Sequence, residues 1–183
     1  MKYLLLSNGL RMAGLPRWAA RALSRLLLIG AVLGGASQLW AAELAGRVVG
    51  VSDGDTITVL TASKQSVRVR LQGIDAPESH QAFGSVSKRA LSGRVFGKHV
   101  SVRYDTQDRY GRVLGVVYLG SEDVNLAMVR DGMAWHYKFY ARDQSPADRQ
   151  RYALAEEGAQ TARIGLWRDA SPTPPWDFRR AQR

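Results

Sequence analysis

The segment "GRVVGVSDGDTITVLTASKQSVRVRLQGI", residues 46–74, has the pattern of three short strands separated by two turns. Val, Ile and Thr dominate the strand-like pieces, and "SDGD" and "ASKQ" interrupt them. In the last piece Val67, Val69 and Leu71 alternate with Arg68 and Arg70. A period of two residues is typical of a strand with one buried face. We therefore expect a three-stranded meander whose arginines lie on the side away from the core.

Strand composition returns in residues 98–104 and 112–120, and three other stretches have helical patterns. Residues 84–97 predict a short helix with Val86, Ala90 and Phe96 on its apolar face. Asp123 is typical of the N-cap of a second helix, which Gly132 would end.

The third helix is predicted to begin at Ser145 and Pro146, a capping residue followed by proline at the first helical position. Its apolar stripe is expected to consist of small or aromatic residues at helical spacing. These are Tyr152, Ala155, Ala159 and Ala162.

This element order predicts an α+β protein, mainly β, with a five-stranded OB-type β-barrel and three helices. We expect three regions: residues 1–42 as a signal peptide or N-terminal anchor, residues 43–168 as the barrel domain, and residues 169–183 as a tail. The tail is rich in proline and arginine, which favours an extended or disordered segment.

The N-terminus has the pattern of an export signal. Residues 1–42 contain five basic residues and no acid, and they end in the apolar run "LLLIGAVLGGASQLWAA", residues 26–42. A basic region, an apolar stretch and small residues predict export, with cleavage near Ala36 or Ala42. An uncleaved membrane anchor is the alternative, because about 17 apolar residues can just span a bilayer. A start at Met12 would give a signal of more ordinary length.

The amino-acid composition limits the possible catalytic groups, metal ligands and partners. The 183 residues include no cysteine, which excludes thiol nucleophiles, disulfides and cysteine-rich zinc sites. A metal would need oxygen ligands or one of three histidines, His80, His99 and His136. Five of the 26 basic residues lie in residues 1–42, so 21 remain against 16 acids. A basic domain favours nucleic acid or a membrane surface as partner, with a solvated basic surface as the alternative.

Three short stretches combine charge types that phosphodiester cleavage requires. They are "DGDT" with Asp53 and Asp55, "VRLQGIDAPES" with Arg70, Asp75 and Glu78, and "DRYGRV" with Asp108, Arg109 and Arg112. Such cleavage uses a hard cation on carboxylate and carbonyl oxygens, a carboxylate that acts on water, and guanidinium groups on the phosphate. Each stretch alone also fits a structural role, as a hairpin turn, a proline turn or surface ion pairs.

Taken together, these stretches resemble the staphylococcal nuclease (thermonuclease) family. "DGDT", "VRLQGIDAPES", "DRYGRVLGVVY", "VNLAMVRDGMAWHYKFY" and "GLW" occur in the family's order and near its spacing, over about residues 45–167. The resemblance implies an OB barrel with three helices. It also implies a Ca²⁺-dependent endonuclease that cuts DNA and RNA and leaves 3′-phosphate ends.

The resemblance also implies roles for individual residues. Asp55 and Asp75 match the carboxylate ligands of Ca²⁺, and the Ala76 carbonyl matches a third ligand. Glu78 matches the general base that acts on water. Arg70 and Arg112 match the arginines that bind phosphate. Asp53 falls beside the metal site rather than among the ligands.

Three positions depart from the family pattern. Ala76 replaces a threonine and so lacks a hydroxyl next to the metal site. Arg109 replaces a lysine with the charge retained. Lys138 replaces one of two substrate-lining tyrosines, and Tyr140 matches the other. A cation at Lys138 would favour phosphate contact over stacking on a base.

Two alternatives remain open on sequence alone: a non-catalytic nucleic-acid-binding barrel of the cell envelope, and a membrane-tethered protein with a structural Ca²⁺ site. We expect DNA and RNA substrates, no obligate protein partner and a monomer. Localisation is predicted as periplasmic or secreted, or as anchored through residues 26–42 with the domain outside the cytoplasm. His80 and His136 are expected to be surface or edge residues rather than ligands.

Overall fold

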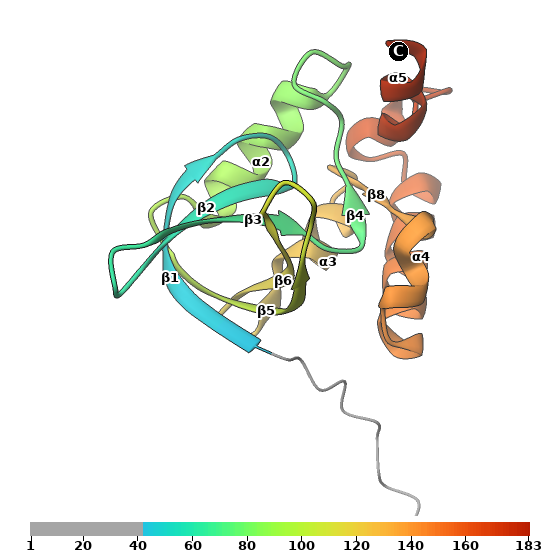
Figure 1. The fold of residues 1–183 in the computed structure, drawn as a ribbon. Coiled ribbons are helices and arrows are strands. Elements are labelled where there is room, and N and C mark those ends of the chain that lie inside the picture. The colour runs from blue at the N-terminus through green and yellow to red at the C-terminus, as the bar shows by residue number, and fades with distance from the viewer. Residues whose placement is uncertain (1–41) are drawn as a thin grey trace, which may run out of the picture. The chain divides into compact units, whose positions relative to one another are not determined.

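Five strands close into a barrel in the computed structural model, which describes residues 42–183 (Figure 1). They are β1 (Ala42–Val51), β2 (Thr56–Thr61), β3 (Ser66–Leu71), β5 (His99–Gln107) and β6 (Val113–Leu119). Strands β1, β2 and β3 form an antiparallel meander, and β5 lies between β1 and β6. A parallel pairing of β3 with β6 closes the barrel. The predicted α+β, mainly β class and the five-stranded OB-type barrel are thus confirmed.

The alternation in β3 determines which residues fill the barrel. Val69 and Leu71 are buried and Val67 is partly buried, whereas Arg68 is exposed. Valine and isoleucine from all five strands make most of the interior. Arg70, on the other face, pairs in register with Thr56 of β2 and Leu114 of β6. Arg70 therefore lies on the outer face of the barrel, at the β3–β6 pairing that closes it.

Three helices follow the predicted order: α2 (Gly84–Val95), α3 (Val124–Arg130) and α4 (Pro146–Thr161). The predicted caps are present, because Asp123 accepts from the Leu126 N–H at 2.9 Å and Ser145 accepts from the Asp148 N–H at 3.1 Å. These bonds satisfy amide groups that the first helical turn leaves free.

The predicted helix faces were partly wrong. Helix α2 ends at Val95, so Phe96 is 56% exposed, and the buried face is instead Ser87, Leu91 and Val95. In α4 the buried stripe includes Glu156, whereas Ala162 lies beyond the last helical residue. A search for apolar residues at helical spacing misses Glu156, because a polar side chain can also be buried when it has hydrogen-bond partners.

Short elements join the barrel to the helices. Strand β4 (Ile74–Asp75) pairs with β8 (Trp135–His136), which sets Asp75 opposite Trp135. Strand β7 (Glu122–Asp123) pairs with β6, and two 3₁₀ turns, η1 (Lys138–Asp143) and η2 (Gly165–Arg168), flank α4. The β4–β8 pair lies outside the barrel sheet, directly after β3, and it contains Asp75.

The C-terminal tail is helical over part of its length, which corrects the expectation of an extended or disordered segment. Within residues 42–183, helix α5 (Pro175–Ala181) is an α-helix beyond the three that were predicted. Proline stands at its first position, Asp177 lies in its first turn, and Arg179 and Arg180 lie in its last turn. This charge order suits the helix dipole. The tail belongs to the same compact unit as the barrel.

The prediction of an export signal or anchor falls on residues 1–42, and all but Ala42 lie outside the described residues. Ala42 itself begins β1. Within residues 42–183, no helix combines the length and apolar character needed to cross a membrane.

Asn125 connects three parts of the domain from a fully buried position. Its side-chain amide donates to the carbonyls of Gln72 (3.0 Å) and Gly115 (3.1 Å), and its oxygen accepts from the Val117 N–H (3.1 Å). Helix α3, strand β6 and the turn after β3 are thereby held in one register.

We predict that Asn125→Ala lowers the free energy of unfolding by about 3 kcal/mol, because it removes three buried hydrogen bonds to the backbone. Of their acceptors, the Gly115 carbonyl keeps the Gln72 N–H as a partner. The denaturant midpoint, measured with an unchanged slope, checks this. Gln160→Ala, at an exposed position of α4, is the matched control and should change stability by no more than about 0.5 kcal/mol. Equal effects of the two substitutions would contradict the role given to Asn125.

Candidate active site

The turn between β1 and β2 delivers Asp55 to the inside of the domain. The Asp53 carboxylate accepts from the Asp55 N–H at 3.0 Å, as in an Asx-turn. Gly54 packs so closely that a Cβ there would stand 1.9 Å from Ser87 Oγ and 2.6 Å from Ala76 Cβ. Glycine is required for that contact. Asp53 and Gly54 therefore form the turn, and Asp55 is free for another role.

The Asp55 carboxylate is buried and only partly compensated. Oδ2 accepts from the Ala76 N–H at 2.7 Å and lies 3.1 Å from Arg70 Nη2. Oδ1 accepts from the Thr56 hydroxyl. Burial raises the pKa of Asp55 to about 8, although the Arg70 charge opposes the rise. The side chain is thus short of positive charge.

Arg70 joins Asp55 to Asp75. Its Nη2 donates to Asp75 Oδ1 at 2.8 Å, and its Nη1 donates to the carbonyls of Leu71 and Ile74, each at 3.0 Å. Asp75 is fully buried in β4. One guanidinium therefore brings together two acids that lie 20 positions apart in the sequence.

Glu78 lies in the loop that follows β4. The loop is closed by Gln81, whose side chain accepts from the Glu78 N–H at 3.1 Å and whose own N–H donates to the Glu78 carbonyl at 2.9 Å. Gly84, at the start of α2, lies so near that a Cβ would stand 1.9 Å from that carbonyl. The Glu78 side chain remains about one-third exposed. It completes what we call the carboxylate cluster, Asp55, Asp75 and Glu78.

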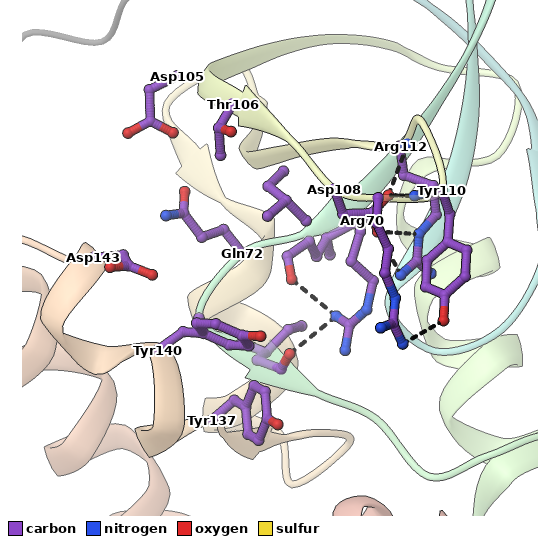
Figure 2. Close-up of a pocket in the computed structure, with 15 residues that line it drawn as sticks. Arg70, Gln72, Asp105, Thr106, Asp108, Tyr110, Arg112, Tyr137, Tyr140 and Asp143 are labelled. Atoms are coloured by element: carbon purple, nitrogen blue, oxygen red, sulfur yellow. Dashed lines mark hydrogen bonds and ion pairs between the residues drawn. The ribbon is translucent and has the colours of Figure 1, made fainter.

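A pocket of about 740 Å³ opens beside the cluster and shares Arg70 with it (Figure 2). Tyr137 and Tyr140 lie on one side of the pocket, and the loop after β5 lies on the other. That loop contributes the two other predicted arginines, Arg109 and Arg112. The walls therefore offer both aromatic rings and guanidinium groups.

Asp108 orients Arg112 within this loop. Its Oδ2 accepts from Arg112 Nε at 2.7 Å, and its Oδ1 accepts from the backbone N–H groups of Tyr110 (2.9 Å) and Arg112 (3.0 Å). Partial burial would raise the pKa of Asp108, but these hydrogen bonds and the Arg112 charge lower it overall. Arg109 stacks on the exposed ring of Tyr110, with 4.8 Å from its guanidinium carbon to the ring centroid.

The structure brings Arg70, Asp55, Asp75, Ala76 and Glu78 together, and it places Arg109, Arg112 and Tyr140 at the adjoining pocket. Lys138 is directed elsewhere, because its ammonium group pairs with the buried carboxylate of Glu156. It is absent from the residues that line the pocket.

The two histidines differ from each other. His136 is buried rather than on the surface, and its Nε2 lies 2.9 Å from Gln144 Oε1. Burial lowers its pKa, so the ring is neutral at pH 7. His80 is exposed, as expected, and contacts Gln182 in the tail at 3.2 Å. Among residues 42–183, neither histidine belongs to a group of three or more acids or histidines that could hold a metal ion.

Sequence reasoning missed Arg179 and Gln81. Arg179 donates to both Asp75 and Glu78. The signal was present, because "PPWDFRR" places proline, an acid and basic residues in the order of a short helix. Gln81 supports Glu78 and also donates to the Thr173 carbonyl at 2.6 Å, and nothing in its sequence context marks it.

The cluster suits a divalent cation by its charge and its donor atoms. Asp55 and Asp75 contact Arg70, and Asp75 and Glu78 contact Arg179, so three carboxyl groups share two guanidinium groups. Oxygen donors of this kind are preferred by Ca²⁺ and Mg²⁺. No three acids or histidines of residues 42–183 are already arranged as a metal site. The predicted set needs only Asp55, Asp75 and the Ala76 carbonyl.

Comparison with known proteins agrees with this geometry. The family model described as "Staphylococcal nuclease homologue" matches residues 68–169. An uncharacterized endonuclease of Haemophilus influenzae is 45% identical over 161 residues, which cover 88% of this chain and 85% of the relative. A micrococcal nuclease of Shigella flexneri is 44% identical over 151 residues, 78% of this chain and 84% of the relative.

A more distant match is a probable staphylococcal-like nuclease of Oryza sativa subsp. japonica, 43% identical over 116 residues, or 63% of this chain and 33% of the relative. The shared part corresponds to a domain within that longer protein. From the barrel, the site and these matches together, the chain belongs to the staphylococcal nuclease family.

Proposed function

We propose that this protein is an exported, Ca²⁺-dependent endonuclease that hydrolyses phosphodiester bonds of DNA and RNA and leaves 3′-phosphate ends. One observation carries the proposal: Asp55 and Asp75 are buried on a single arginine, Arg70, which also lines a pocket with two further arginines, and Arg179 links Glu78 to Asp75. Family membership supports nuclease activity. Export rests on the signal-like residues 26–42, and the product ends rest on the family resemblance.

Asp55, Asp75 and the Ala76 carbonyl would hold the cation. When bound, Ca²⁺ neutralises charge on the phosphate that is attacked. Two features of Asp55 favour cation binding. Burial disfavours the ionised form of Asp55, and the Ala76 N–H bond fixes the direction of its carboxylate. A cation beside Asp55 would supply the positive charge that burial has made scarce.

Glu78 is the residue placed to take a proton from water. Its backbone is held by Gln81 and by the close contact with Gly84, while the carboxylate reaches solvent. A carboxylate held in this way can orient and deprotonate a water molecule next to a bound phosphate. Arg70 donates to Asp75 at 2.8 Å and also lines the pocket.

Arg70 and Arg112 would bind the phosphate and stabilise the charge that develops on it. A guanidinium donates two parallel hydrogen bonds to phosphate oxygens and stays charged at any working pH. Asp108 keeps the Arg112 fork oriented without substrate. Less reorganisation is then needed when the phosphate arrives, which favours the transition state.

Arg109 and Tyr140 are proposed to contact the substrate beyond the cleaved bond, since both line the pocket. Tyr140 is 45% exposed, so its ring is open to stacking on a base. Lys138 remains a proposed phosphate contact, and it would first have to leave Glu156. The basic composition favours association with polyanions in general.

We predict that cleavage of plasmid DNA and of RNA requires Ca²⁺ and stops in excess chelator, since the cation would neutralise charge on the attacked phosphate. Parallel digests with Ca²⁺, Mg²⁺ and chelator measure this. The DNA products should prime a polymerase only after phosphatase treatment, which reports 3′-phosphate ends. Undiminished cleavage in chelator would exclude the metal mechanism. Salt-sensitive binding with no cleavage would favour the non-catalytic barrel.

We predict that Glu78→Gln lowers turnover by about 100-fold to 10,000-fold, the usual contribution of a general base. The amide keeps an oxygen that accepts from Arg179, so the thermal midpoint should stay near that of the wild type. Single-turnover cleavage rates measure the effect. Glu157→Gln, at an exposed position of α4, is the control. A Glu78→Gln protein with wild-type turnover would remove Glu78 from the reaction.

A further inference from the structure

Arg179 of helix α5 is bound to two members of the carboxylate cluster. Its Nη1 donates to Glu78 Oε1 at 2.7 Å and to Asp75 Oδ1 at 3.2 Å, and its Nη2 donates to Asp75 Oδ2 at 2.7 Å. Both oxygens of Asp75 are thus engaged by one planar guanidinium. Two-point binding of this kind is among the stronger ion pairs in proteins.

The helix that carries Arg179 is held in place by aromatic contacts of two residues that precede it. The Trp176 ring stacks on Tyr137 at 5.4 Å between centroids and meets Trp135 edge-on at 5.6 Å. Phe178 packs on His80 at 5.3 Å. Figure 1 shows α5 facing the loop between β4 and α2, the loop that carries Glu78.

The same tail is tied to that loop upstream and downstream of the helix. Gln81 donates to the Thr173 carbonyl at 2.6 Å, and His80 lies 3.2 Å from Gln182. A helix as short as α5 is not stable by itself in water, so these contacts keep it folded. The folding of α5 therefore depends on its contacts with the rest of the domain, including those of Arg179 with the carboxylates.

A divalent cation and the Arg179 guanidinium need the same oxygen atoms. Asp75 contributes both of its oxygens to Arg179 and one of them also to Arg70. Oδ1 already accepts two hydrogen bonds and Oδ2 accepts one, so Asp75 has little acceptor capacity left. A cation bound to Asp75 would also lie beside the Arg179 guanidinium, and the repulsion between the two positive charges would weaken the Arg179 contact.

We propose that the tail, residues 169–183, is an autoinhibitory plug in which Arg179 competes with the divalent cation for Asp75 and Glu78. The inference rests on the proposed cation-dependent function of this site. The apparent affinity for the cation is then reduced by the fraction of molecules with the plug undocked. The plug would keep the enzyme at low activity until the Ca²⁺ concentration is high.

Arg179→Ala tests the plug. We expect the variant to bind Ca²⁺ about tenfold more tightly than the wild type, as for a plug that is docked nine-tenths of the time. Titration calorimetry with Ca²⁺ alone, without nucleic acid, measures this. Cleavage should increase at limiting Ca²⁺ and match the wild type at saturating Ca²⁺.

Arg180→Ala is the matched control. Arg180 lies on the same helix, pairs with Asp177 at 3.0 Å and is largely exposed, so its removal should leave Ca²⁺ affinity unchanged. Arg179→Lys keeps the charge but loses the planar fork, and it should fall between the wild type and Arg179→Ala.

Each other outcome has a defined meaning. Equal or weaker Ca²⁺ binding by Arg179→Ala overturns the plug, and cleavage by both proteins in Ca²⁺ would leave the proposed function intact. Loss of cleavage with unchanged Ca²⁺ affinity also overturns it and would make Arg179 a catalytic residue. If neither protein binds Ca²⁺, the plug and the cation site fail together.

A second measurement follows the tail directly in the unaltered protein. Chymotrypsin cleaves after aromatic residues, and Trp176 and Phe178 are partly covered while α5 is docked. We expect saturating Ca²⁺ to speed cleavage at these two sites relative to chelator. Equal rates in the two conditions would overturn displacement of the plug by the cation.

Discussion

The contact of Arg70 with two buried acids is the interaction on which the site depends. Asp55 and Asp75 lie almost without solvent, and two neighbouring carboxylates in such surroundings repel each other. Arg70 supplies a charge to both and donates to two backbone carbonyls. Loss of one partner of a buried ion pair typically costs about 3–5 kcal/mol. The same side chain thus stabilises the domain and opens toward the pocket.

The barrel makes that contact possible through its closure. Arg70 lies where β3 pairs with β6, one turn before the chain leaves the barrel as β4. Asp55 arrives from the β1–β2 turn and Asp75 from β4, which pairs with β8. The acids are therefore fixed by rigid backbone. The pocket-lining residues Arg109 and Tyr140 lie on exposed connections, where adjustment to a bound molecule is easier.

The fold was largely predictable because local patterns and global packing agree. Alternation in β3, the Asp123 and Ser145 caps and the Asp-Gly turn each have a short-range cause. The different roles of Asp53 and Asp55 were implied by the family resemblance, and the Asx-turn bond of Asp53 agrees with them. The grouping of Asp55, Asp75 and Glu78 was predicted from family resemblance, because no spacing rule brings a hairpin turn to a loop 20 positions later.

The failures have physical reasons of the same kind. Phe96 was placed in the core by periodicity, but the helix ends one residue earlier. Lys138 was assigned to substrate because nothing local reveals the buried Glu156 on the facing helix. The tail was expected to be extended from its composition, although its capping order favours a helix that tertiary contacts then stabilise. For Lys138 and the tail, the deciding contacts come from residues far away in the sequence, which a local pattern does not contain.

The central claim is that Asp55 and Asp75 hold a divalent cation next to Arg70. Anomalous scattering from crystals grown in Ca²⁺ tests it most directly. We expect one calcium peak between the two carboxylates, with Arg179 moved off Asp75. A structure at saturating Ca²⁺ with no peak there, and with Arg179 still bound to Asp75 and Glu78, would contradict it.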